Sequence, residues 1–429
     1  MAMIRYAHIR RILLLLLLLF VWSVMLLPGA GEWYALTIYP SLSKGLSAIS
    51  SLFPFSLGDL FIYGTLLWFV VDMIRTSMLR REKKWRRKGV QVAESLLWIY
   101  AWFYMAWGLN YYRNSFFIRN QLEPKPFSEE EFCRFLDSYT DSLNNSYCPF
   151  EDKLPDSVLV QEIKRAYQML PDKSGLCKPT CYMRVKEMLL PSLMSGVGVM
   201  GYIGPFFVEY NLNPQLLPVQ YPATYAHEMA HVLGVSNEAE ANYYGYRICI
   251  SSSVREIRFS GYFSLLGYVL SNAYSVLDEE AFESWKNRLR PEIRELYNQK
   301  IAYWLSLYNP FIGTVQDWIY NAFLKGNGIS SGIANYAYNK SVSKKGTPTK
   351  VESSSQEKDK ESKHKERTTA KPETFSQEED KESEHKEETT AKVERVCTHV
   401  GDESGFVKTL SDCHGLRYGI AQLPCCFLL

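Results

Sequence analysis

Histidine is scarce in this chain, with seven among 429 residues. Only two of them, His227 and His231, lie between residues 114 and 340; the others are His8 and four beyond residue 360. A metal site with three histidine ligands is therefore excluded from the middle of the chain. The net charge is also low, at +2 near neutral pH, so the charge balance gives no reason to expect nucleic acid as a partner.

The nine cysteines match no common metal or redox module. Cys177 and Cys181 are separated by three residues, which differs from the C-x-x-C spacing of redox centres and zinc ribbons. Four cysteines and two histidines lie in residues 397–429, and their spacing also fits no zinc module. We interpret the earlier cysteines as core residues or one disulfide, and residues 397–429 as a cysteine-containing tail of unknown role.

Three long apolar runs occupy the first 113 residues, at about 12–27, 57–74 and 92–109. Each run approaches the roughly 20 residues that a helix needs to cross a hydrocarbon layer of about 30 Å. We therefore predict that residues 1–113 form a membrane region with three transmembrane helices. The basic start of the first run is also typical of a signal peptide, whose removal would leave the rest of the chain on the same side.

Basic residues are distributed unevenly among the connections between these runs. Three arginines precede the first run and eight lysines or arginines lie between the second and third, whereas the loop between the first two contains only Lys44. Basic loops remain in the cytoplasm. We therefore predict a cytoplasmic N-terminus, a chain that lies outside the cytoplasm after Arg113, and the lipid bilayer as one partner.

Residues 114–340 have the composition of a mixed globular domain. A capping box at Ser128 predicts one helix, and the segments 182–190 and 201–211 are expected to be extended. Further helices are predicted at 222–233, 238–250, 260–273, 278–306 and 312–324. The expected fold class is mainly α with a small β-sheet (α+β).

Residues 341–396 contain almost no apolar side chains and carry two copies of a 21-residue repeat. Such a segment cannot bury enough apolar surface to offset the conformational entropy that is lost on folding. We predict a disordered charged linker.

The stretch Tyr225-Ala-His-Glu-Met-Ala-His-Val-Leu-Gly234 contains an H-E-x-x-H motif. On a helix, His227 and His231 lie on one face, where both imidazoles reach a single zinc ion. Glu228 then points toward the water molecule that attacks the substrate. The alternative, two surface histidines beside a glutamate, is disfavoured because the surrounding residues are apolar and predict a buried helix, in which unpartnered polar groups are costly.

A catalytic zinc site needs a third protein ligand and an open position. With no other histidine in this region, we expect a carboxylate, from either Glu238 or Glu240. These two side chains are about 200° apart around a regular helix, so they cannot both bind one ion, and the helical period favours Glu238. Asn242, one turn later, is predicted to orient one of the histidines.

The sequence leaves two further features of the predicted site undecided. The group that stabilises a developing oxyanion is expected among Tyr243, Tyr244, Tyr246 and Arg247, because no histidine remains for this role. Residues 204–211 form either an edge strand that binds an extended peptide or an ordinary internal strand.

Three stretches of the chain carry a resemblance to a known family. They are Ser51–Asp59, Trp107–Arg113 and His227–Asn242, and they resemble the bacterial membrane family called domain of unknown function 3810 over roughly residues 30–335. Members of this family look like zinc peptidases. The Glu-x-x-Ala-Asn sequence that ends at Asn242 is also similar to the Glu-x-x-Ala-Asp of gluzincin peptidases. This similarity implies that Glu238 is a zinc ligand, and it places Asn242 where those enzymes have aspartate.

Together, these features predict a membrane-anchored zinc-dependent metallopeptidase in a bacterial inner membrane. The domain at 114–340 is expected to be zincin-like and extracytoplasmic, with a peptide or protein as substrate. The predicted metal ligands are His227, His231 and Glu238, the cofactor is Zn2+, and Glu228 is the catalytic base. Two alternatives remain: a non-catalytic membrane scaffold or sensor with a structural metal site, and a zinc hydrolase that acts on a cell-wall amide.

Overall fold

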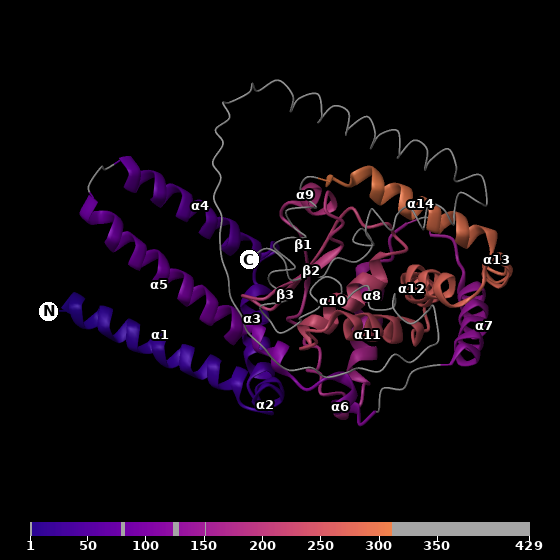
Figure 1. Ribbon diagram of the computed structural model, residues 1–429, viewed down its shortest axis with the longest axis horizontal. Coiled ribbons are helices and arrows are strands. Elements are labelled where there is room, and N and C mark those ends of the chain that lie inside the picture. Colours follow the sequence, from indigo (N-terminus) through magenta and orange to yellow (C-terminus); the bar gives the residue numbers. More distant parts are fainter. Residues whose placement is uncertain (1, 79–81, 123–127, 151, 311–429) are drawn as a thin grey trace, which may run out of the picture. The chain divides into compact units, whose positions relative to one another are not determined.

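The computed structural model describes residues 2–78, 82–122, 128–150 and 152–310. These residues are mostly helical and contain one small sheet (Figure 1), which confirms the expected mainly α class with a small β-sheet. The helix predicted at 312–324, the linker at 341–396 and the tail at 397–429 lie outside the described residues.

The described elements of the N-terminal part of the chain are all helices. Its elements are α1 (Ala2–Leu26), α2 (Ala30–Thr37), α3 (Tyr39–Ser50), α4 (Leu57–Met78), α5 (Glu82–Ala106) and the 3-10 helix η1 (Gly108–Tyr112). Among the described residues, two helices are long and apolar enough to cross a membrane, namely Tyr6–Leu26 within α1 and the whole of α4.

The prediction of three such helices is therefore wrong in number. The third apolar run lies on α5, which starts in a basic stretch and carries Glu94. The end of this run packs inside the protein, where Ala101, Phe103 and Trp107 are at most 5% exposed. An aromatic-rich run can be buried in a protein core or can face lipid, and the two cases look alike in sequence. Here much of the run is part of the protein core.

Ion pairs define how α1, α4 and α5 lie next to one another (Figure 1). Glu94 of α5 pairs with Arg10 of α1 at 2.7 Å, and Lys88 of α5 pairs with Asp72 of α4 at 2.6 Å. The start of α1, the end of α4 and the start of α5 therefore lie together. The opposite ends of these three helices lead into the rest of the protein.

The remaining described elements surround a three-stranded sheet. They are α6 (Phe116–Asn120), α7 (Glu129–Ser146), α8 (Asp156–Gln168), η2 (Asp172–Ser174), β1 (Val185–Glu187), α9 (Pro191–Ser195), β2 (Gly201–Gly204), β3 (Glu209–Leu212), α10 (Tyr221–Val232), α11 (Glu238–Ile250), α12 (Arg255–Val276), α13 (Glu279–Asn287) and α14 (Pro291–Leu307). The capping box at Ser128 is confirmed at the start of α7.

The sheet has the strand order β1-β3-β2, with β3 parallel to β1 and antiparallel to β2. The prediction of a single extended segment over 201–211 is wrong, because residues 205–208 form a turn in which Val208 has a φ of 49°. Of the two alternatives for 204–211, the internal strand is the one observed in β3. The edge of the sheet next to α10 is β2.

The helices predicted after residue 220 are present as α10, α11 and α12. The prediction of one helix over 278–306 is wrong, since α13 ends at Asn287 and α14 begins at Pro291. Proline has no amide hydrogen and its ring clashes with the preceding turn, so it interrupts a helix but fits the first turn of a new one.

One hydrophobic core joins the regions before and after residue 113. It contains Tyr39 and Trp107 from the N-terminal helices together with Ala226 and Met229 of α10, all of them fully buried. The folding of the H-E-x-x-H helix is therefore coupled to the N-terminal helices.

Candidate metal centre

The H-E-x-x-H sequence lies on α10, a helix that is buried along nearly its whole length. Pro222 is in the first turn, where its missing amide hydrogen is not needed. Gly234 follows the helix with a φ of 99°, a conformation that glycine adopts without strain. His227 is the residue of α10 that is only partly buried, so the histidine face reaches the solvent at one end.

The chain turns back after α10, and α11 packs alongside it. Asn237 caps α11, because its side chain accepts a hydrogen bond from the amide of Glu240 at 3.0 Å. Gly245 approaches α10 so closely that a Cβ at this position would lie 3.2 Å from the backbone nitrogen of His227. This close packing brings the first turn of α11, which carries Glu238, to the histidine face of α10.

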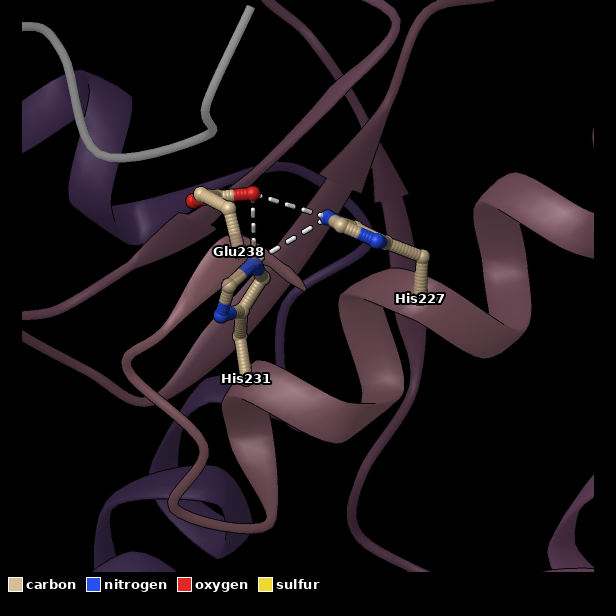
Figure 2. A group of neighbouring side chains, drawn as sticks. All are labelled: His227, His231 and Glu238. Atoms are coloured by element: carbon tan, nitrogen blue, oxygen red, sulfur yellow. Dashed lines mark hydrogen bonds and ion pairs between the residues drawn. The ribbon is translucent and has the colours of Figure 1, made fainter. Parts of the chain in front are cut away.

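Figure 2 shows the three side chains that converge there, His227, His231 and Glu238. Oε2 of Glu238 lies 3.2 Å from Nε2 of His227 and 3.5 Å from Nε2 of His231, and the two nitrogens are 3.1 Å apart. Tetrahedral zinc with bonds of about 2.05 Å places its ligand atoms about 3.3 Å apart. The three separations therefore fit three ligands of a single zinc ion.

The outer nitrogen of each ring shows how the histidines are held. Nδ1 of His231 lies 2.7 Å from the carbonyl oxygen of Val235, to which it donates a hydrogen bond, so the other ring nitrogen, Nε2, faces Glu238. Nδ1 of His227 is buried and has no hydrogen-bond partner among the described residues. The orientation of His231 is thus fixed by the backbone, as is usual for metal-ligating histidines.

The charges in the cluster also suit a cation. Burial by itself lowers the pKa of His231, but the Glu238 carboxylate more than offsets this and raises it to about 9. Burial by itself raises the pKa of Glu238, but His231 outweighs it and brings the pKa down to about 2. An environment that holds a proton between these groups also stabilises a metal ion in its place.

Glu228 lies beside this cluster and packs against the edge strand. Its side chain is 1% exposed. A Cβ on Gly201 of β2 would lie 2.5 Å from Oε1 of Glu228, so a side chain at position 201 would displace the carboxylate. The structure therefore places the three predicted ligands together and Glu228 on the adjoining helix face toward β2.

Side chains from the first 113 residues bind the carbonyl groups at the end of α10. Tyr39 donates its hydroxyl to the carbonyl of Val232 at 2.7 Å, and Trp107 donates its indole N–H to that of His231 at 2.9 Å. Arg113 donates a hydrogen bond to the carbonyl of Gly234, two residues beyond the helix, at 3.0 Å. The last carbonyls of a helix have no partner inside it, so these contacts complete the helix and hold His231 in place.

We expect Tyr39→Phe to lower the free energy of unfolding by about 1–3 kcal/mol, because it leaves the buried carbonyl of Val232 without its partner. Chemical unfolding of the detergent-solubilised full chain measures this. Tyr63→Phe is the matched control, since the Tyr63 hydroxyl is buried without a hydrogen-bond partner among the described residues. That control is expected to be neutral or stabilising. Equal losses in both variants would contradict the role of Tyr39.

Two other predicted site residues lie elsewhere. Glu240 forms a buried ion pair with Arg119, so the structure brings Glu238 and not Glu240 to the histidines. The prediction that Asn242 orients a histidine is wrong, because its amide donates to the hydroxyl of Tyr268 at 3.4 Å.

The described contacts of the predicted oxyanion groups on α11 are with residues outside the cluster. Tyr244 is buried against Phe116, Tyr246 packs on Tyr262, and Tyr243 and Arg247 are exposed.

Tyr268 of α12 lies beside Asn242, and the sequence did not indicate it. Burial and then the charge of Glu238 raise its pKa above the usual value, which places it in the electrostatic field of the cluster. It belongs to no motif and reaches the site only because α12 packs on α11. The spacing of residues in the sequence therefore could not identify Tyr268.

Fold and site together define a largely helical protein with two helices able to cross a membrane and a candidate metal centre on an H-E-x-x-H helix. The chain belongs to the family described as Protein of unknown function (DUF3810), which matches residues 34–341. This confirms the family resemblance, and the matched range contains the whole candidate centre. No curated protein and no solved structure matches the chain significantly.

Proposed function

We propose that this protein is a membrane-anchored zinc-dependent metallopeptidase. The observation that carries the proposal is the convergence of His227, His231 and Glu238 at separations of 3.1 to 3.5 Å. Structural zinc sites usually have four protein ligands, whereas catalytic sites keep one position open. The cluster has three candidate ligands among the described residues, and the buried Glu228 lies next to it.

Residues of the candidate centre would fill two of the roles in zinc-dependent peptide hydrolysis, holding the ion and transferring a proton. Bound zinc would act as a Lewis acid that polarises the scissile carbonyl and lowers the pKa of water. His227, His231 and Glu238 would hold the ion, with His231 oriented by the backbone of Val235. Glu228 accepts the proton of the attacking water and delivers it to the leaving amine.

We also propose that the candidate centre lies outside the cytoplasm of a bacterial cell. Arg10 and Lys88 lie at one end of the helical group formed by α1, α4 and α5, and basic loops remain in the cytoplasm. The other ends of these helices enter the part of the protein that contains α10. Because α5 returns along α1, it can cross the bilayer beside α1 without being apolar enough to span a membrane alone.

The test is to purify the full chain in detergent, measure its metal content and assay hydrolysis of a fluorogenic peptide library. We expect one zinc ion per chain, peptide cleavage that a chelator abolishes, and recovery of activity when zinc is restored. Stoichiometric zinc with cleavage of cell-wall amides alone would replace the peptide substrate. Stoichiometric zinc without any hydrolysis would favour the scaffold or sensor, and a folded chain without zinc affinity would refute the metal site.

A further inference from the structure

An exposed apolar surface lies where α4 leaves the rest of the protein. Two segments form it, the loop between α3 and α4 and the connection from β1 through α9. We call it the interfacial patch, and its members are Leu52 (78% exposed), Phe53 (39%), Phe55 (46%), Leu189 (50%), Leu190 (42%) and Leu193 (38%). Apolar patches of this kind on a protein surface usually mark a binding site.

Polar contacts hold the two segments of the patch together. Lys186 of β1 donates hydrogen bonds to the carbonyls of Phe53 and Phe55 in the loop, and Asp59 at the start of α4 accepts one from the amide of Leu189 at 2.9 Å. The ammonium group of Lys186 is also 3.9 Å from the buried carboxylate of Glu209 in β3. The exposed side chains are therefore presented by an ordered framework.

This framework accounts for the stretch Ser51–Asp59 that carries part of the family resemblance. Glu209 accepts hydrogen bonds from Ser50 at 2.5 Å and from Ser56 at 2.9 Å, and Asp59 accepts one from Tyr202 of β2 at 2.6 Å. Each of these contacts fixes the loop to the sheet. None of them requires the neighbouring Leu52 or Phe55 to be exposed and apolar, so those side chains need a separate explanation.

The patch is continuous with the helix that is apolar enough to cross a membrane. Phe55 is two residues before α4, whose side chains Leu60 and Leu67 are 53% and 64% exposed. A surface that adjoins a lipid-facing helix and exposes phenylalanine and leucine has the composition of a membrane-interface contact. A charged or polar surface would be expected there if the domain stood clear of the bilayer.

We propose that the interfacial patch inserts into the boundary between headgroups and acyl chains of the bilayer that α4 crosses. This inference rests on the membrane placement proposed above. The domain that carries the patch therefore contacts the lipid surface directly. Because Lys186, Asp59 and Glu209 connect the patch to the sheet that packs on α10, the candidate metal centre is held at a fixed height above the bilayer, within reach of substrates close to the membrane.

The test is photo-crosslinking of the full chain in vesicles of phosphatidylethanolamine and phosphatidylglycerol. A benzophenone amino acid is placed at Leu52 or Leu190 in the patch, at Leu67 in α4 as the membrane control, and at Met169 as an exposed apolar control (73% exposed) outside the patch. Mass spectrometry identifies the adducts. We expect lipid adducts at Leu52 and Leu190 in yields close to that at Leu67 and many times that at Met169.

The other outcomes separate the patch from the membrane placement. Lipid adducts at Leu67 alone would overturn the patch and leave the placement of α4 intact. No lipid adduct even at Leu67 would overturn both. Adducts from Leu52 or Leu190 to protein, either within the chain or to a second copy, would show that protein and not lipid covers the patch.

Discussion

Replacing Glu238 by glutamine is expected to remove most of the bound zinc, whereas the same replacement at Glu240 is expected to leave it bound. Oε2 of Glu238 is within 3.5 Å of both histidine nitrogens, and an amide is a poor, uncharged ligand for zinc. Loss of a partner behind a ligand already weakens metal binding by about 10–100-fold, so loss of a ligand should weaken it by more than about 100-fold.

The two replacements form a matched pair because both residues are glutamates in the first turn of α11. Glutamine at position 240 still offers an oxygen to Arg119, its partner in the structure. Zinc content after dialysis and competition with a chromophoric chelator give the two affinities. The reverse order, with zinc lost at position 240 and retained at 238, would transfer the ligand role to Glu240 and show that α11 is rotated relative to α10.

The convergence of His227, His231 and Glu238 could be predicted from the sequence because it depends mainly on local geometry. His227 and His231 are four residues apart on one helix, and the absence of another histidine in this region required a carboxylate. The period of the next helix favoured Glu238. What sequence could not supply was the approach of α11 to α10, which depends on Gly245 packing against the backbone of His227.

The hydrogen bonds that hold the end of α10 could not be predicted, because their donors are distant from α10 in the chain. Tyr39 lies 193 positions from the carbonyl that it binds, and Trp107 lies 124 positions from its own. The composition of the apolar aromatic run that contains Trp107 is also typical of a transmembrane helix. The run is partly a core segment, and composition does not distinguish burial in protein from burial in lipid.

The same limit applies to the sheet. Residues 201–211 have the composition of one extended segment, yet the chain reverses at Val208 and places β3 inside the sheet. The edge strand β2 then meets Glu228 through Gly201. The sequence does not show whether a glycine at this position packs closely on a carboxylate or simply begins a strand.

Glu228→Gln is expected to lower the rate of peptide hydrolysis by about 100- to 10,000-fold, the usual contribution of a positioned general base. Glutamine has nearly the same shape, so it fits the space beside Gly201, but it cannot accept the proton of the attacking water. Because Glu228 is not among the three converging ligands, zinc content should stay at the wild-type level. The loss should appear in kcat, with little change in KM.

Glu240→Gln serves here as the control for the chemical change itself, since it converts a nearby buried glutamate that faces Arg119. It should retain both zinc and activity when the chain is folded. A Glu228→Gln chain that binds zinc and hydrolyses peptides at the wild-type rate would remove Glu228 from the mechanism. The zinc site would then stand without its assigned base.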